Sequence, residues 1–365
     1  MPLFIRLEFT MKQTCKRLLL FVLVLASILA LSACSAYPEE KGTDEERMKI
    51  ASLDGHLYPT YDLYRFVFLS NKQNLLREGV EGDALFAACD AAAKEEIYRL
   101  YALFSLCEKN EIDPYSKEID KEVNALLKEL IEGDGKGNEG YGSFEAYLAA
   151  IKENYMTDRV SRLDIRYAVC EARLAKALTE KEAFKVSDED LAAFYNGEEL
   201  ANVMWAYFSP EMQHFNDPAL VAAVINNAKN TKNPEDFYKI AVNYQNLFFN
   251  MTEEMEGGVL VAKRQLSLEY KALTDAIFAL SEGQTSEEIR IGYSEKSKSY
   301  GIYIAHRLAK PTLDLTNEEQ RAEVEESYKL NAFYKLLEEE AARLKQNTRY
   351  YDFYHTITLE TVTMP

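Results

Sequence analysis

The chain has 365 residues with 42 basic and 60 acidic side chains, a formal net charge of −18. Such a surface repels polyanions and therefore argues against DNA or RNA as a partner. The length is enough for two domains, and the 24 tyrosines and 18 phenylalanines predict packed cores rather than a disordered chain.

The N-terminal part contains an apolar run, residues 18–34, that follows several basic residues and ends in Leu31-Ser32-Ala33-Cys34. An export signal has this order, with a basic segment first, an apolar segment next and small residues last. The last four residues resemble the lipobox of bacterial lipoproteins. This resemblance implies that residues 1–33 are a signal peptide and that Cys34 becomes the lipidated first residue of the mature chain. An uncleaved transmembrane anchor is the alternative, although the run is short for a span of about 20 residues.

Without residues 1–33 the chain carries 38 basic and 59 acidic side chains, a net charge of −21. Residues 34–49 are mostly polar and predict a flexible tether between the lipid and the folded part. Three further cysteines, an odd number, lie in apolar helical stretches and predict buried free thiols rather than disulfide bonds. They are Cys89, Cys107 and Cys170.

Residues 50–186 predict a helical domain. Ile50–Leu53 is typical of a short strand that enters a turn at Asp54-Gly55. Apolar residues then recur at helical spacing. The predicted helical regions are 61–76, 85–109, 114–131 and 144–185.

The pattern changes at Val186, where Ser187 and Asp190 have the spacing of a helix-capping box. Residues 187–312 predict a second domain with the order β-α-α-β-α-β-β after a short helix. The predicted elements are strands 202–208, 259–260, 289–291 and 301–306, and helices 218–230, 233–244 and 268–280. In residues 313–365, a long helix to about Gln346 and a strand at 356–362 are expected to pack back on the helical domain.

Several motifs, in this order, resemble those of the exported SurA/PrsA-type foldases, whose inserted domain is a parvulin peptidyl-prolyl isomerase. The resemblance covers about residues 50–312. It implies an α+β fold in which a helical SurA-N-like chaperone domain, completed by a C-terminal helix, carries an inserted parvulin-like domain. The motifs are NPEDFYKIA at 233–241, GGVL at 257–260, AIFAL with Gly283 at 276–283, and SYGIYI at 299–304.

The same resemblance places the two histidines of active parvulins at Trp205 and Tyr303, so both are absent here. No convincing equivalent of the family's aspartate or cysteine occurs in residues 245–256. Trp205 and Tyr303 are therefore predicted to form a degenerate site, with Tyr207 and Phe278 as candidates for the lining of an apolar cup. Catalysis of isomerisation is predicted to be lost.

Other patterns that could carry chemistry are weak. His56, His214, His306 and His355 show no metal-ligand spacing and are predicted to lie at the surface or at strand edges. Residues 134–145 resemble a calcium loop, but Lys136 and Glu139 replace a ligand and the turn glycine. The run Glu338–Glu340 predicts a solvated helix face. No Gly-x-Ser-x-Gly motif occurs, and no metal or cofactor is expected.

The sequence thus predicts a foldase or chaperone held by lipid on the extracytoplasmic face of the cell membrane, with unfolded or newly exported polypeptides as its partners. Two alternatives stay open. One is an active peptidyl-prolyl isomerase with non-standard site residues, and the other is a lipoprotein that uses the fold for assembly or structure.

Overall fold

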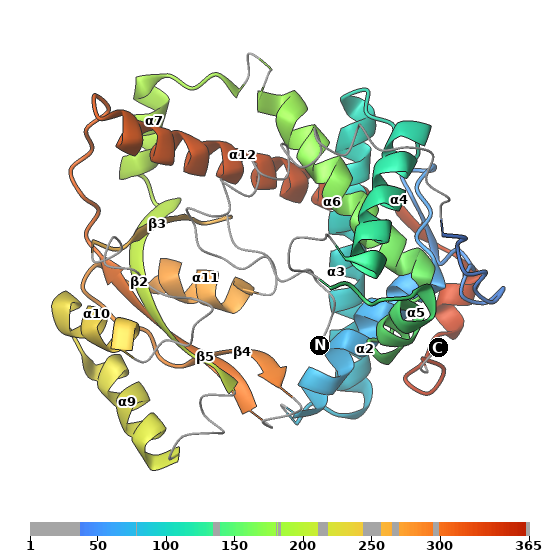
Figure 1. The fold of residues 1–365 in the computed structure, drawn as a ribbon, viewed down its shortest axis with the longest axis horizontal. Helices are drawn as coiled ribbons and strands as arrows, with labels where there is room; N and C mark the ends of the chain where they lie inside the picture. Colours follow the sequence, from blue (N-terminus) through green and yellow to red (C-terminus); the bar gives the residue numbers. More distant parts are fainter. Residues whose placement is uncertain are drawn as a thin grey trace. The chain divides into compact units, whose positions relative to one another are not determined.

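A computed structural model shows an α+β protein with a small two-stranded sheet, a four-stranded sheet and long helices (Figure 1). The predicted signal peptide and Cys34 lie outside the residues that the structure describes. Among the described helices, none combines the length and apolar character that a membrane span requires. The described residues are 37–77, 79–133, 139–179, 181, 184–210, 218–243, 257–264, 270–294 and 299–362.

The described chain divides into two compact units. The helical unit contains the residues before position 181 together with those from Leu336 onward. The second unit, which we call the sheet unit, is Lys181–Lys335. The helical unit is therefore discontinuous in sequence, and the sheet unit is inserted into it.

Helices form most of the helical unit. Two of them begin directly after a serine whose hydroxyl oxygen accepts a hydrogen bond from a backbone N–H group of the first turn, which has no partner within the helix. Ser116 accepts from Ile119 and Ser143 accepts from Ala146. The helices are α2 (Tyr61–Arg77), α3 (Gly82–Lys109), α4 (Lys117–Glu132), α5 (Phe144–Glu153) and α6 (Asp158–Thr179). The three thiols of this unit, Cys89, Cys107 and Cys170, are buried and free, which confirms that prediction.

A two-stranded antiparallel sheet joins the two ends of the helical unit. β1 (Ala51–Leu53) pairs with β6 (Thr348–Tyr350), with Ser52 opposite Arg349. The predicted strand at 356–362 is wrong, because Thr356 ends a 3₁₀ helix (Asp352–Thr356) and residues 357–362 lie in no strand. Hydrogen bonding to β1, a partner about 300 residues away, fixes the strand at Thr348, and no local pattern reveals that partner.

The part of the predicted tether that the structure describes packs on the helical unit, so flexibility is the wrong prediction for residues 37–49. The ring of Tyr37 stacks on Phe144 with 5.2 Å between centroids. Further along, the carboxylate of Glu46 binds Arg65 at 2.7 Å, and the backbone oxygen of Glu46 accepts from Arg159 at 2.8 Å. Polar side chains from helices remote in sequence hold this segment.

The sheet unit begins with α7 (Asp188–Asn196), which has the predicted capping box between Ser187 and Asp190. Its sheet is antiparallel with the strand order β3-β2-β5-β4. The predicted order of elements is confirmed. The strands are β2 (Leu200–Phe208), β3 (Val259–Ala262), β4 (Ile289–Ser294) and β5 (Ser299–Leu308), and the helices are α9 (Pro218–Asn230), α10 (Pro234–Asn243) and α11 (Lys271–Ala279).

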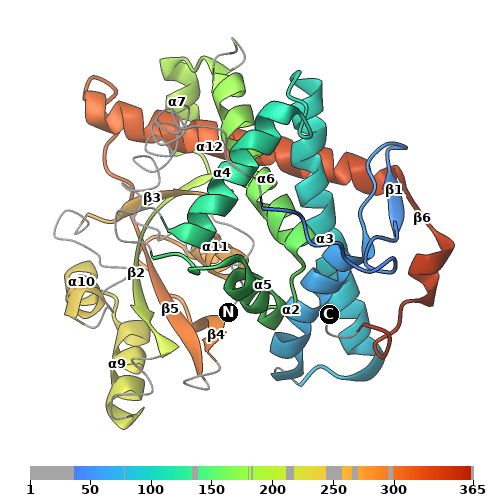
Figure 2. The ribbon, with the colours of Figure 1, turned by 45° about the vertical axis from the view of Figure 1, so that its right-hand side comes forward.

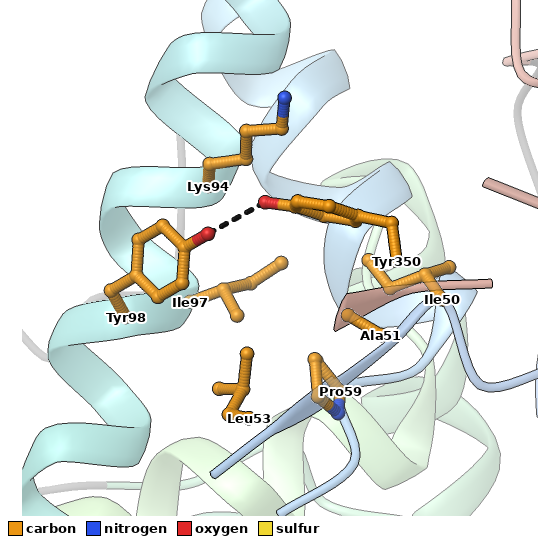
Figure 3. A pocket seen from close by; sticks show the side chains of 8 residues that line it. All are labelled: Ile50, Ala51, Leu53, Pro59, Lys94, Ile97, Tyr98 and Tyr350. Carbon is orange, nitrogen blue, oxygen red and sulfur yellow. Dashed lines mark hydrogen bonds between the residues drawn. The ribbon is translucent and has the colours of Figure 1, made fainter. Parts of the chain in front are cut away.

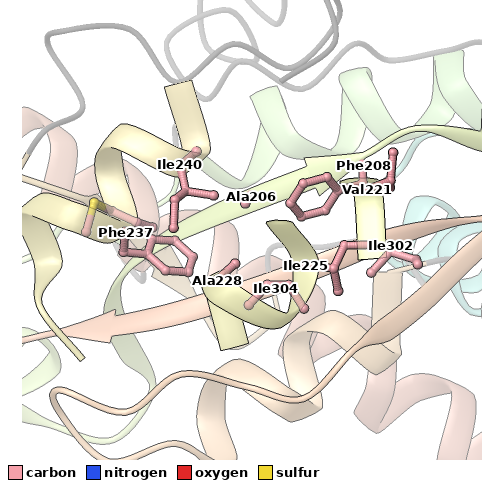
Figure 4. Packing of buried hydrophobic residues seen from close by; sticks show 11 residues of the cluster. Ala206, Phe208, Val221, Ile225, Ala228, Phe237, Ile240, Ile302 and Ile304 are labelled. Atoms are coloured by element: carbon pink, nitrogen blue, oxygen red, sulfur yellow. The ribbon is translucent and has the colours of Figure 1, made fainter. Parts of the chain in front are cut away.

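Helices cover both faces of this sheet, as Figures 1 and 2 show. On one face, α9 and α10 pack on alternate residues of β2 and β5, among them Phe208 and Ile304 (Figure 4). On the other face, α11 packs through Leu273 and Ile277. Because successive strand side chains point to opposite faces, β2 and β5 supply both cores.

The long predicted helix α12 runs from Glu318 to Gln346, and its two parts belong to different units. The first part contributes Val324 to a core with α7. In the second part, Glu340 is 6% exposed and binds Lys109 and Arg343, so a solvated face is the wrong prediction for this residue.

Candidate functional site

The predicted site residues lie on one face of the four-stranded sheet. Tyr207 is directly opposite Tyr303 in the antiparallel pairing of β2 with β5, and Trp205 is opposite Ala305. Paired residues of an antiparallel ladder point to the same face, as do residues two apart on one strand. Trp205, Tyr207 and Tyr303 therefore share the face that α11 covers, and all three pack in the same apolar cluster.

Tyr207 and Tyr303 form the centre of this face. Their rings stack with 4.5 Å between centroids and 29° between planes. Tyr303 is 4% exposed, whereas Tyr207 and Trp205 are partly exposed. The ring of Tyr207 extends over Gly301, where an added Cβ would lie 2.7 Å from the ring and 2.8 Å from the Ile291 carbonyl oxygen. A glycine at this position thus leaves space for the tyrosine pair.

Helix α11 completes the cluster. Tyr270, which immediately precedes the helix, meets Tyr303 edge to face at 6.1 Å. Phe278 packs against the same cluster and is partly exposed, with the Lys263 ammonium 5.9 Å from its ring. We call Trp205, Tyr207, Tyr270, Phe278 and Tyr303 the aromatic face.

The aromatic face consists of three phenol rings, one indole and one phenyl ring. Its polar side-chain atoms are the tyrosine hydroxyls and the indole N–H. A phenol with an ordinary pKa near 10 is a poor general acid or base at neutral pH. Flat, partly exposed rings instead suit contact with apolar side chains.

His306 lies on the opposite face and is fully buried, so a surface position is the wrong prediction for this residue. Its ring stacks on Phe237 at 5.1 Å. The sequence of β5 does indicate this burial. Ile302, Ile304 and His306 are spaced two residues apart and therefore share one face, and the first two are apolar. His56 and His355 are exposed, as predicted, and His214 lies outside the described residues.

Two hollows in the helical unit offer no clear alternative site. Residues from β1, α3 and β6 line a cavity of about 10 Å³, beside which the hydroxyls of Tyr98 and Tyr350 are 2.7 Å apart (Figure 3). This volume holds at most one water molecule. An open polar hollow of about 410 Å³ lies beside Tyr37, and its arginines, Arg162 and Arg166, bind Asp158 and Asp120.

The described residues contain no cluster of three or more histidine, cysteine or acidic side chains that could hold a metal ion. Residues 134–138 of the calcium-like loop and residues 245–256 lie outside the described chain. Sequence reasoning missed two contributors to the aromatic face, Tyr270 and Gly301. Tyr270 carried no signal beyond its position before a helix. Gly301 could have been noticed as a glycine inside a strand, which often marks a close approach.

Comparison with known proteins gives structural similarity only. No family model and no curated protein matches the sequence. The chain is similar to crystal structures of foldase protein PrsA from Streptococcus pneumoniae str. Canada MDR_19A, with 16% identity over 86% of this chain and 97% of that one, TM-score 0.27. PrsA from Lactococcus lactis has 13% identity over 87% and 99%, TM-score 0.24, and PrsA from Bacillus subtilis has 15% identity over 72% and 86%, TM-score 0.24. TM-scores this low do not establish a common fold.

Proposed function

We propose that this chain is an exported, lipid-anchored chaperone or foldase that holds unfolded polypeptides and does not catalyse prolyl isomerisation. The observation that carries the proposal is the aromatic face. Trp205 and Tyr303 occupy the positions where the sequence resemblance expects catalytic histidines, and they share one face of the sheet with Tyr207 and Phe278.

The loss of catalysis follows from the barrier of the reaction. Rotation about a peptide bond crosses a barrier of about 18–20 kcal/mol. A catalyst lowers it with polar groups arranged to stabilise the twisted amide. The described aromatic face has tyrosine hydroxyls but no titratable group suited to neutral pH. Aromatic rings can still bind the apolar side chains of an unfolded client, since burial of apolar surface is favourable without catalysis.

Two further features support a holding role. The apolar run that ends at Cys34 would place the protein at the membrane where exported chains emerge, and tethering raises the local concentration of a weak binder. The mature net charge of −21 would keep the protein soluble while it carries an aggregation-prone client.

The proposal is tested with the chain from residue 35 in an assay of client aggregation by light scattering. We expect the chain to suppress aggregation and Trp205→Ala or Tyr207→Ala to weaken this suppression several-fold, because each removes partly exposed aromatic contact area. Tyr238→Ala is the matched control, since Tyr238 is a partly buried tyrosine that packs on the opposite face of the sheet.

Three results are distinguishable. Suppression that depends on Trp205 and Tyr207 but not on Tyr238 supports the proposal. Acceleration of prolyl isomerisation in a proline-containing peptide, lost in Tyr303→Ala, would instead identify an active isomerase. A chain that neither suppresses aggregation nor accelerates isomerisation would point to an assembly or structural role.

A further inference from the structure

The segment that follows the predicted lipidation site is fixed to the helical unit from its first described residue. The hydroxyl of Tyr37 donates a hydrogen bond to Glu132 Oε1 at 2.8 Å, at the end of α4. Its ring stacks on Phe144 at the start of α5. Tyr37 thus contacts two helices at once.

The backbone next to Tyr37 is held by a charged pair from α6. Arg162 Nη2 donates to the carbonyl oxygens of Tyr37 at 3.0 Å and Pro38 at 3.3 Å, and the backbone N–H of Glu40 donates to Asp158 Oδ2 at 2.9 Å. The side chains of Arg162 and Asp158 are 11% and 0% exposed and bind each other at 2.9 Å. Charge-assisted bonds from nearly buried groups are among the stronger polar contacts in proteins.

The distance from Cys34 to this fixed point is short. Three peptide units separate Cys34 from Tyr37, and three residues span at most about 11 Å when fully extended. A lipid on Cys34 therefore cannot leave the helical unit free at the end of a long tether.

We propose that the surface around Tyr37, formed by the end of α4, the start of α5 and residues 37–40, rests against the headgroup layer of the membrane. We call it the anchor surface. The inference rests on the proposed lipid anchor at Cys34, and its occupant is the phospholipid bilayer that carries that lipid.

Charge on the anchor surface does not supply the attraction. Lys152 binds Glu40 at 2.9 Å and Lys128 lies 3.8 Å from Glu132, with the lysine side chains 47% and 41% exposed. Each lysine is thus matched by an acid, unlike the unpaired basic cluster that attracts anionic lipid. The short covalent connection is what brings the surface to the headgroups, so the contact should depend little on ionic strength.

The test measures the distance of two labelled positions from the headgroups. The full chain is produced with its own signal in a host that processes lipoproteins and is then reconstituted in phosphatidylcholine vesicles. A fluorophore is attached at Glu145→Cys, next to Phe144, or at Asp83→Cys in the first turn of α3. Both positions are exposed, whereas Cys89, Cys107 and Cys170 are buried and would stay unlabelled.

Asp83 serves as the distant control within the same unit. α3 has 28 residues and is therefore about 40 Å long. Tyr115, shortly after its far end, lines the same hollow as Tyr37. We expect headgroup nitroxide lipids to quench the label at position 145 at least threefold more than the label at position 83.

A second variant lengthens the connection without touching the folded unit. Twenty Gly/Ser residues inserted between Ala36 and Tyr37 would add a mean separation of about 25 Å. We expect this insertion to reduce quenching at position 145 to the level at position 83. Equal quenching at the two positions, unchanged by the insertion, would overturn the inference even if the protein floats with the vesicles.

Failure of the anchor itself has a different signature. If mass spectrometry finds no lipid on Cys34 of the processed natural chain, or if that chain does not float with vesicles, the lipid anchor is wrong and the inference falls with it. A lipid on Cys34 of the natural chain, loss of flotation in the chain from residue 35, and strong quenching at position 145 in the natural chain together support both.

Discussion

At the scale of single residues, His306 is a buried base whose charge state couples folding to pH. Thr285 donates its hydroxyl to the Thr231 carbonyl oxygen at 2.7 Å and therefore accepts from His306 Nδ1, 2.8 Å away. His306 Nε2 is buried without a hydrogen-bond partner among the described residues. A charged ring would carry a second N–H, at Nε2, with no acceptor among the described residues, and burial lowers the pKa of His306 below its usual 6.5.

The sheet unit should lose stability as the pH falls. Below about pH 6.5 the unfolded chain takes up a proton at this histidine while the folded chain does not, so acid favours unfolding by at most about 1.4 kcal/mol per pH unit. Urea unfolding between about pH 7.5 and 5 measures this. Trp205, the single tryptophan of the chain, reports on the sheet unit by fluorescence.

His306→Leu is the comparison variant, because leucine is apolar, suits a buried position and cannot titrate. The slope of the free energy of unfolding against pH should flatten in this variant. An unchanged slope would mean that other groups cause the pH dependence and that His306 is not the buried base described here.

At the scale of elements, α12 is tied to α3 by Glu340. Its carboxylate accepts from Ser105, Lys109 and Arg343, at 2.5 to 2.7 Å. Burial would raise the pKa of Glu340, but the hydrogen bonds from Arg343, Lys109 and Ser105 outweigh it and lower the pKa to about 2. The ionised form therefore stabilises the folded state at neutral pH.

Glu340→Gln should lower the free energy of unfolding at pH 7 by about 1.5–3 kcal/mol, the range for hydrogen bonds to charged groups. Glu340 contributes this stability above its usual pKa of 4.5 and loses it as the pH falls from 4.5 toward 2. The difference between the two proteins should therefore shrink over that interval. Urea unfolding followed by circular dichroism measures it, with exposed Glu339→Gln as the matched control.

Elements defined by local patterns could be predicted from the sequence, and those defined by remote partners could not. The capping box at Ser187 and the alternation in β2 and β5 mark their elements directly. β6 and the packing of Tyr37 depend on partners far away in the chain. The burial of Glu340 depends on Lys109 in the same way, because a charged residue in an acidic run carries no local sign of a cation that will meet it.

The aromatic face shows the same division. Alternation along β2 places Trp205 and Tyr207 together, and pairing with β5 adds Tyr303. Which helix covers that face cannot be read from periodicity, and neither can the contact of Tyr270 with Tyr303. The sequence therefore predicts the strand residues of the candidate site better than its helical wall.

Across the whole molecule, holding a client and catalysing prolyl isomerisation make different demands on the protein. The proposed holding of a client rests on the aromatic face of the sheet unit and on the net charge of −21 that the chain carries without residues 1–33. Catalysis would need polar groups arranged to stabilise the twisted amide. Holding scales with the amount of chaperone relative to client, whereas catalysis acts at small fractions of it, so one refolding experiment can tell them apart.

The most direct test is the refolding of a client whose slow phase is prolyl isomerisation, with this chain added from substoichiometric to equimolar amounts. The account predicts that the yield of folded client rises toward equimolar chaperone while the rate constant of the slow phase stays unchanged or falls. A slow phase that accelerates at substoichiometric amounts, and no longer does so in Tyr303→Ala, would contradict it.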